Sequence, residues 1–490
     1  MTSQLLADRI IALASSAGVE DFFISPGSRS QALVLAADKL KQANLAKTTV
    51  RIDERSMSFT ALGASLKSHK PTAMIVTSGT AVANLHPAML EAHHAGVSLI
   101  ALTADRPSRL RGKGSNQTTL QPGIFDSRVI DFVDVESEDD ISLAKQKLTE
   151  AIIGNQPLQI NICFDEPLSG ESDPERFLEV TNFEELTYAV TEIDCNLKGV
   201  VIAGAGGERA KEFAEKANWP LFAEPSSGAR SGPNAILNYA DLLNTEVAEN
   251  IQQVVVFGKP TLNRSVASLI KTQAEVIVVG SRYGNFDIAD NATQVQVLAA
   301  VGQADDQWLA QWKQDQNHPG FGREALVRKI WEKSSPQDNV YLGASKMIRV
   351  ADIAAPAKAI SVFSNRGLAG IDGSVSTAIG IAMKTEGVTR AIIGDLTAIH
   401  DLGGLNFSGI NLKNLQLWVV NDRGGKIFEQ LELKQEVSPE VFDRYFQTPQ
   451  QVDFEKIARA FGWGYELATD EQDIDNCLDI EGPVLIELKL

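Results

Sequence analysis

The sequence predicts an α/β protein built from three doubly wound domains with mostly parallel sheets. Three observations support this fold class. The chain has 490 residues, which is too long for a single hydrophobic core. Its first third alternates short apolar strands with helical patterns, as parallel sheets with helices on both faces do. The same alternation returns in the middle and last thirds, so we predict domains at residues 1–170, 196–315 and 336–490.

The first domain is predicted from apolar stretches that favour strands, at residues 21–25, 48–53, 72–79, 98–105 and 157–164. Residues 1–18 are expected to form an amphipathic helix, and helical patterns cover residues 54–68 and 81–96. After residue 177 the sequence becomes polar and irregular, as expected for a linker that ends near Leu197.

The other two domains are predicted in the same way. Expected strands lie at residues 199–204, 252–258, 274–280, 359–365, 390–396, 415–422 and 483–490, and an expected helix lies at 323–334. The Gly-rich stretch Gly204–Ala210 has Arg209 where a dinucleotide fingerprint needs its last glycine. We therefore predict a plain turn between strand and helix at this stretch.

Composition and charge limit the classes of function. A net charge of −18 is unlike the basic surface of a nucleic-acid-binding protein. The cysteines Cys163, Cys195 and Cys477 form no metal-binding pattern and favour reduced thiols. The N-terminal stretch lacks the pattern of a signal peptide, and apolar runs stay below the ~20 residues that span a bilayer. We expect a cytoplasmic protein that binds neither nucleic acid nor membrane.

An anion site is expected where the first strand meets the next helical pattern. The stretch "SPGSRS" at Ser25–Ser30 combines three hydroxyls with the guanidinium of Arg29. A helix N-terminus offers free N–H groups and a positive dipole end, which favour negative charge. An acidic chain that binds an anion must concentrate its cations locally, as this stretch does.

Two polar stretches, "IIGDL" and "VVNDRGG", follow apolar strands of the last domain. The carboxyl ends of strands in an open α/β sheet face the ligand crevice, so Asp395 and Asp422 can share it with the backbone of Gly424 and Gly425. Hard oxygen ligands in this arrangement suit a magnesium ion that also holds phosphates. Taken singly, each stretch is also explained as an ordinary loop.

Together the two stretches resemble the fingerprint of thiamine-diphosphate enzymes, a Gly-Asp pair followed nearly thirty residues later by Asn-Asn. Asp395 and Asp422 are 27 positions apart. The resemblance implies a metal site made by Asp395, Asp422 and the backbone carbonyl of Gly424. Asp422 stands where those enzymes have asparagine and adds a negative charge to the metal site. The expected ion is Mg²⁺, with Mn²⁺ as the alternative. The implied cofactor-binding residues are Glu54, Gly394, Asp395, Leu396, Asp422, Gly424, Gly425, Ile427 and Phe428.

Further motifs narrow the resemblance. "SPGSRS", "DERS", "TSGTAVAN", "LTADRP", "NQT", "SNRGLAGIDGSVSTAIG" and "NDRGGKIFEQL" occur in one order. They are similar to the family of 2-succinyl-5-enolpyruvyl-6-hydroxy-3-cyclohexene-1-carboxylate synthases of menaquinone biosynthesis. The match is dense in the first and last thirds and faint in the middle. It implies the thiamine-diphosphate enzyme fold, with a pyrimidine-binding, a central and a diphosphate-binding domain in that order.

The resemblance implies an activity. The family decarboxylates 2-oxoglutarate on thiamine diphosphate and adds the resulting carbanion to isochorismate in a 1,4-addition that releases CO₂. Such an enzyme is a carboligase, a transferase of aldehyde or ketone residues. Family active sites lie between subunits, which implies a homodimer or homotetramer. Two alternatives stay open: another thiamine-diphosphate-dependent 2-oxo acid decarboxylase or carboligase, and a binding protein that keeps the fold without turnover.

Both implied substrates are dicarboxylates, so the anion at Ser25–Ser30 is expected to be a carboxylate, which arginine can bind with two hydrogen bonds. A surface arginine is the alternative at each position. By resemblance, Arg29 and Arg366 also act in catalysis. The implied substrate-binding residues are Ser28, Arg29, Arg106, Asn116, Gln117, Ser345, Arg349 and Arg366.

Five further residues are candidates, and all but Arg264 have two possible roles. Glu54 is implied as the catalytic carboxylate against the aminopyrimidine ring, although the dipole of the following helix also explains it. Ile427 and Phe428 match the apolar support of the thiazolium ring, or are simply core. His400 beside the metal-site strand favours a structural hydrogen bond over an acid–base role. In the central domain, Arg264 is a weak match to a basic position of the family.

Overall fold

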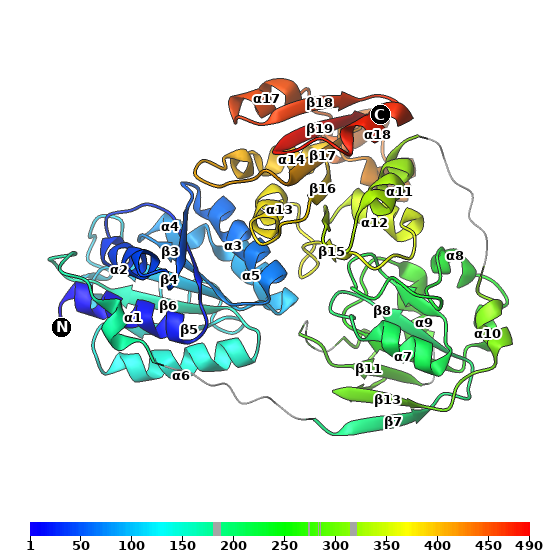
Figure 1. The fold of residues 1–490 in the computed structure, drawn as a ribbon, viewed down its shortest axis with the longest axis horizontal. Coiled ribbons are helices and arrows are strands. Elements are labelled where there is room, and N and C mark those ends of the chain that lie inside the picture. The colour runs from blue at the N-terminus through cyan, green and yellow to red at the C-terminus, as the bar shows by residue number, and fades with distance from the viewer. Residues whose placement is uncertain (180–187, 273–274, 283, 285, 314–320) are drawn as a thin grey trace. The chain divides into compact units, whose positions relative to one another are not determined.

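The computed structural model describes residues 1–179, 188–272, 275–282, 284, 286–313 and 321–490. These residues contain two six-stranded sheets and one five-stranded sheet, in which all paired strands are parallel, with helices between the strands (Figure 1). The predicted α/β fold class is confirmed. By their contacts the residues form two compact units. Unit 1 is Met1–Glu185, Asp372–Lys384 and His400–Leu412, and unit 2 is Leu186–Ile371, Thr385–Ile399 and Lys413–Leu490.

Unit 1 is built on a sheet with the strand order β2-β1-β3-β4-β6-β5. Its strands are β1 (Asp21–Ile24), β2 (Lys47–Val50), β3 (Thr72–Val76), β4 (Leu99–Asp105), β5 (Asp131–Val135) and β6 (Leu158–Cys163). Its longer helices are α1 (Ser3–Ser16), α2 (Gln31–Gln42), α3 (Glu54–Ser68), α5 (His86–Ala95), α6 (Asp140–Ile153) and α13 (Ser374–Ala382). Residues of α1, α2 and α6 share one buried apolar cluster with the strands. Figure 1 shows α3 and α5 on the other side of this sheet.

The start of α3 is fixed by several contacts, and Glu54 is its first residue. The carboxylate of Asp53 accepts hydrogen bonds from the N–H groups of Arg55 and Ser56, at 2.9 and 3.1 Å, and so caps the helix. Helix α13 approaches so closely that a Cβ at Gly63 would lie 2.1 Å from the carbonyl oxygen of Thr377. Only glycine fits there, and this packing holds α3 in place.

One helix predicted in unit 1 is in fact two. The pattern over residues 81–96 predicts a continuous helix, but the structure has α4 (Thr80–Ala83) and then α5 (His86–Ala95). Pro87 lies in the first turn of α5. Proline has no N–H group and clashes with the preceding turn, so it begins a new helix and does not continue the old one.

Unit 2 contains two larger sheets, with the strand orders β12-β11-β10-β8-β9 and β15-β14-β16-β17-β19-β18. The strands of the first are β8 (Gly199–Ala203), β9 (Leu221–Ala223), β10 (Gln253–Phe257), β11 (Val276–Val279) and β12 (Ala292–Val295). The strands of the second are β14 (Asn339–Leu342), β15 (Ser361–Phe363), β16 (Thr389–Gly394), β17 (Leu415–Asn421), β18 (Gly464–Ala468) and β19 (Val484–Lys489). As predicted, a turn follows β8 at the Gly-rich stretch and leads into α7 (Ala210–Ala217).

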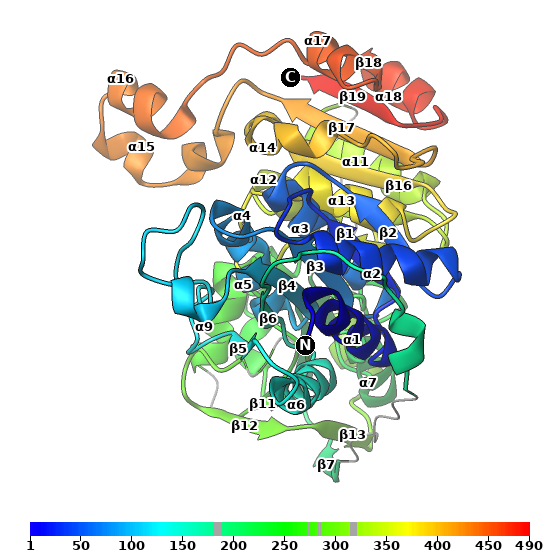
Figure 2. The same cartoon turned by 90° about the vertical axis from the view of Figure 1, so that its left-hand side faces the viewer.

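The remaining helices of unit 2 lie around these sheets. They are α8 (Tyr239–Leu242), α9 (Arg264–Thr272), α10 (Asp306–Ala310), α11 (Arg323–Lys333), α12 (Lys346–Ala354), α15 (Leu433–Glu436), α16 (Pro439–Phe442), α17 (Phe454–Ala460) and α18 (Glu471–Cys477). In Figure 2 the segment with α15 and α16 extends away from the second sheet. Within the described ranges, no helix has both the length and the apolar character needed to cross a bilayer.

The linker predicted after residue 177 is wrong in part. Strand β7 (Val190–Asp194) lies within it and pairs with β13 (Val297–Val301) in a small parallel sheet. Most of β7 is exposed, so it lacks the apolar run by which the other strands are found. The rest of this linker (180–187) and residue 274 of the strand predicted at 274–280 lie outside the described residues. The domain boundaries stay predictions.

Candidate active site

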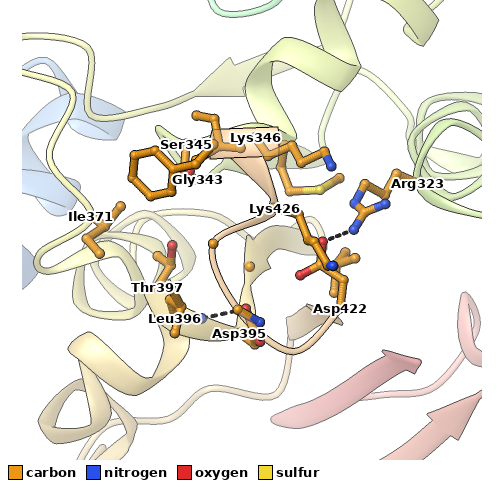
Figure 3. A pocket seen from close by; sticks show the side chains of 17 residues that line it. Arg323, Gly343, Ser345, Lys346, Ile371, Asp395, Leu396, Thr397, Asp422 and Lys426 are labelled. Carbon is orange, nitrogen blue, oxygen red and sulfur yellow. Dashed lines mark hydrogen bonds and ion pairs between the residues drawn. The ribbon is translucent and has the colours of Figure 1, made fainter. Parts of the chain in front are cut away.

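A pocket in unit 2 lies at the carboxyl ends of three neighbouring strands, β14, β16 and β17 (Figure 3). Gly343 follows β14, Asp395 follows β16, and Asp422 follows β17, and all three line the pocket. The strands are parallel and adjacent in the sheet, so their ends meet at one edge. This is the crevice in which open α/β sheets bind ligands, and both predicted metal-binding aspartates line it.

Asp395 is the first residue of the short helix α14 (Asp395–His400) and is only 4% exposed. One oxygen of its carboxylate accepts the N–H of Leu396 at 2.8 Å, and the other accepts the N–H of Gly424 at 2.7 Å. Burial raises the pKa of Asp395, and these two backbone hydrogen bonds oppose that rise. The carboxylate is therefore held in one orientation beside the loop that follows β17.

Gly424 has a backbone conformation that this loop requires. Its φ angle is +124°, and a Cβ would lie 2.3 Å from the carbonyl oxygen of Gln447. The next N–H, of Gly425, donates to that same carbonyl at 2.6 Å. A side chain at position 424 would clash with Gln447 and break the close approach of this loop to Asp395.

The donor set fits a hard divalent cation with a diphosphate. The described residues hold no group of three His, Cys, Asp or Glu side chains that could bind a metal alone. Asp395 and Asp422 therefore need further oxygens, which the backbone at Gly424 and a phosphate or water would supply. The pocket also has room near the backbone, because Gly394, Gly424 and Gly425 line it.

Three cations also line this pocket. Arg323, the first residue of α11, forms an ion pair with Asp422 (dashed in Figure 3). Lys426 pairs with Glu429 at 3.0 Å. Lys346 is the first residue of α12, and burial, together with the nearby Arg323 and Lys426, lowers its pKa. Sequence reasoning missed all three cations.

The predicted apolar residues also lie at this site. Ile427 and Phe428 are half-buried, line the pocket, and belong to the short 3₁₀ helix Lys426–Gln430. The ring of Phe428 packs edge-on against Phe446 with 6.1 Å between the ring centroids. They can therefore support a ring in the pocket and pack on neighbouring side chains at the same time.

A second cluster lies in unit 1 and joins three of the recognised motifs. The guanidinium of Arg106 donates to the hydroxyl of Ser78 at 2.9 Å and to the carbonyl of Gln117 at 2.8 Å. The side-chain amide of Gln117 donates to the carbonyl of Ser78 at 2.8 Å. Burial and the nearby Arg106 lower the pKa of Arg29, which donates to the carbonyl of Phe164 at 3.1 Å.

The three serine hydroxyl groups of "SPGSRS" form different contacts. Ser25 and Ser30 donate to the carbonyls of Arg51 and Gly27, at 2.8 and 3.0 Å, so both stabilise the turn itself. Ser28 and Asn116 are exposed. The anion-binding groups left at this end of the sheet are thus Ser28 and the guanidinium groups of Arg29 and Arg106.

Comparisons with known proteins identify the family of this chain. The N-terminal TPP binding domain of thiamine pyrophosphate enzymes matches residues 5–127, and the C-terminal TPP binding domain matches residues 342–488. The chain is 36% identical to the 2-succinyl-5-enolpyruvyl-6-hydroxy-3-cyclohexene-1-carboxylate synthase of Leifsonia xyli subsp. xyli, over 94% of this chain and 92% of that protein. It is 37% identical to the enzyme of the same name from Renibacterium salmoninarum, over 99% and 93% of the two chains. The chain belongs to this synthase family. The first matched region contains Glu54, and the second contains Asp395 and Asp422.

The other family-derived positions lie around the pocket of unit 2 in different ways. Ser345 lines this pocket, and Arg349 donates to the carbonyl of Ser345 at 2.9 Å while lining a neighbouring pocket. Arg366 is only 4% exposed, donates to the hydroxyl of Thr261, and lies outside the lining of the pocket. Arg264 is well exposed, 3.6 Å from Glu432. His400 is exposed, and its carbonyl accepts a hydrogen bond from Arg55.

Glu224 is a fully buried carboxylate next to Arg366, and sequence reasoning missed it. One of its oxygens accepts the N–H groups of Thr261 and Leu262, at 2.6 and 2.7 Å. Burial raises the pKa of Glu224 to about 8, and the positive charge of Arg366 opposes the rise. Glu224 thus holds the turn whose Thr261 contacts Arg366.

Glu224→Gln is expected to stabilise the protein at alkaline pH. The folded pKa lies above the unfolded value, so wild-type stability is lost as pH rises from about 4.5 to about 8. Glutamine keeps the acceptor oxygen and cannot ionise. The melting temperature of Glu224→Gln should exceed that of wild type by at least about 3 °C at pH 8.5 and match it near pH 5. The exposed control Glu249→Gln should show no such dependence, and an equal shift at both pH values would contradict this account.

Proposed function

We propose that this chain joins 2-oxoglutarate to isochorismate with loss of CO₂, using thiamine diphosphate and a divalent metal ion. One observation carries the proposal: Asp395 and Asp422 line a single pocket beside the backbone of Gly424, within the region that the C-terminal thiamine pyrophosphate domain matches. The product is 2-succinyl-5-enolpyruvyl-6-hydroxy-3-cyclohexene-1-carboxylate, which the names of the relatives give.

The residues of unit 2 hold and orient the cofactor. Asp395, Asp422 and the carbonyl of Gly424 would bind Mg²⁺ or Mn²⁺, which links them to the diphosphate. Ile427 and Phe428 offer apolar surface to a ring. When bound, thiamine diphosphate supplies the electron sink that decarboxylation requires. The protein binds, orients and excludes water.

Glu54 in unit 1 completes the proposed cofactor site. A carboxyl group there can share a proton with a ring nitrogen of the aminopyrimidine. Glu54 belongs to unit 1 and the pocket to unit 2, so the proposal assigns residues of both units to catalysis. A homodimer or homotetramer with shared sites is part of the proposal, and so is a cytoplasmic location, which suits the three buried, free cysteines.

The cluster around Arg106 is proposed to bind the carboxylates of the substrates. Arg29 and Arg106 concentrate two positive charges in an acidic chain. Guanidinium groups bind carboxylates through paired, charge-assisted hydrogen bonds. Ser28, Asn116 and Gln117 would add neutral hydrogen bonds beside them. In unit 2, Arg349 and Arg366 would serve the second carboxylate, with Ser345 beside them.

Arg106→Ala is expected to lower kcat/KM for isochorismate by about ten- to a hundredfold, because a charge-assisted hydrogen bond is lost. Binding of thiamine diphosphate should stay within about twofold of wild type, since the cofactor pocket belongs to unit 2. Steady-state kinetics and calorimetry measure the two quantities. Arg128→Ala is the control, because Arg128 is exposed and pairs only with Asp126. Unchanged kinetics in Arg106→Ala would remove the residue from the substrate site.

The alternative is another thiamine-diphosphate-dependent 2-oxo acid decarboxylase or carboligase. The test compares CO₂ release from 2-oxoglutarate with isochorismate consumption in the same sample. The proposal predicts equal amounts, and little CO₂ when isochorismate is omitted. CO₂ release at the same rate without isochorismate, with free aldehyde as product, would favour the alternative.

A further inference from the structure

The pocket of unit 2 concentrates positive charge beside the expected metal ligands. Arg323, Lys346 and Lys426 line it together with Asp395 and Asp422 (Figure 3). The whole chain carries a net charge of −18, so a pocket lined by three cations differs from the acidic character of the rest of the chain. Lys426 is already paired with Glu429. Arg323 is paired with Asp422, an expected metal ligand, and Lys346 forms no ion pair with a described residue.

Both cations stand where a cation is unfavourable. Arg323 is the first residue of α11 and Lys346 the first residue of α12, and each side chain thus adds positive charge to the positive end of a helix dipole. Lys346 forms no hydrogen bond or ion pair with the residues that the structure describes, and the nearest opposing charge is that of Glu429, which is already paired with Lys426. An anion bound in the pocket would offset the cost at both positions.

The charge of the metal site explains why a bound diphosphate would need Arg323 and Lys346. Two carboxylates, Asp395 and Asp422, neutralise a divalent ion, whereas an aspartate and an asparagine would leave it one positive charge. With Asp422 in place of asparagine, the ion therefore attracts a diphosphate less strongly. Further positive charge from the protein has to make up the difference.

We propose that Arg323 and Lys346 bind the diphosphate of the cofactor and compensate for the second carboxylate, Asp422. The inference rests on the proposed function. Arg323 pairs with Asp422 in this structure, so a metal ion and Arg323 compete for the same carboxylate. A metal ion bound by Asp422 would leave the guanidinium available for the diphosphate, and Lys346 would bind the anion without breaking an ion pair with a described residue.

The test is calorimetry of thiamine diphosphate binding in the presence of Mg²⁺. Arg323→Gln and Lys346→Gln should each weaken binding by about ten- to a hundredfold, while Arg323→Lys and Lys346→Arg should retain most of the affinity. Lys333→Gln removes the same charge from α11 at a site where Lys333 pairs with Asp479, and should bind like wild type. Lys346→Gln breaks no hydrogen bond or ion pair with the described residues, and an unchanged melting temperature would show that the variant is folded.

A double-mutant comparison tests the compensation itself. In an Asp422→Asn background, Arg323→Gln should weaken binding by less than about threefold, because the metal keeps a positive charge for the diphosphate. Wild-type affinity in both Arg323→Gln and Lys346→Gln would overturn the inference. An equal loss in both backgrounds would overturn the compensation by Arg323. Absence of binding by the wild type would overturn the proposed function as well.

Discussion

Glu54→Gln is expected to lose about a hundred- to ten-thousandfold in turnover while it still binds thiamine diphosphate. When bound, thiamine diphosphate would supply an acidic proton at C2 and the amino group that takes it. The carboxyl group of Glu54 would share a proton with the far ring nitrogen of the aminopyrimidine and so make that amino group a better base. Glutamine fills the same space and forms a hydrogen bond, but it cannot exchange a proton in this way.

The measurement for Glu54→Gln is hydrogen–deuterium exchange at C2 of the bound cofactor, quenched and followed by NMR. This readout is independent of the substrates. Glu54 starts α3, whose first turn Asp53 caps, so a change of one atom in the side chain leaves the helix intact. If the variant exchanges as fast as wild type, Glu54 is a carboxylate stabilised by the helix dipole and not the activator.

Asp395→Ala is expected to weaken binding of thiamine diphosphate and Mg²⁺ by at least about a hundredfold. It removes a metal ligand, and it also removes the acceptor that holds the N–H groups of Leu396 and Gly424. Asp422→Asn should bind within about tenfold of wild type, since its amide oxygen can still coordinate. Calorimetry with each variant measures both. Equal binding by Asp395→Ala and wild type would rule out this metal site.

Most strands predicted from the sequence contain a run of buried apolar residues, although the edge strands β2 and β15 were also predicted and the buried β14 was missed. β4, β16 and β17 are almost entirely buried, and each contains a run of at least three apolar residues. β5 and β18 were missed because they lie at sheet edges, with polar and exposed residues along them. The pattern of apolar residues along a sequence reveals strands that are buried. An edge strand depends more on hydrogen bonds to its neighbouring strand, and these leave no such pattern in the sequence.

The same difference separates the site residues that were predicted from those that were missed. Asp395 and Asp422 end apolar strands, so the topology of a parallel sheet brings them to one edge. Arg323 and Lys346 reach the same pocket from the starts of α11 and α12, which lie 99 and 76 positions before Asp422. No local pattern links them to the aspartates. Their position at the positive ends of helices, where a cation is costly, is the signal that could have drawn attention to them.

The mass of the reaction product distinguishes the proposed synthase from a simple decarboxylase. The purified protein is mixed with thiamine diphosphate, Mg²⁺, 2-oxoglutarate and isochorismate. The masses of the products are then measured by mass spectrometry. The account predicts a single new compound with the combined mass of 2-oxoglutarate and isochorismate less one CO₂, formed only when all components are present. A free four-carbon aldehyde with isochorismate left unchanged would contradict it.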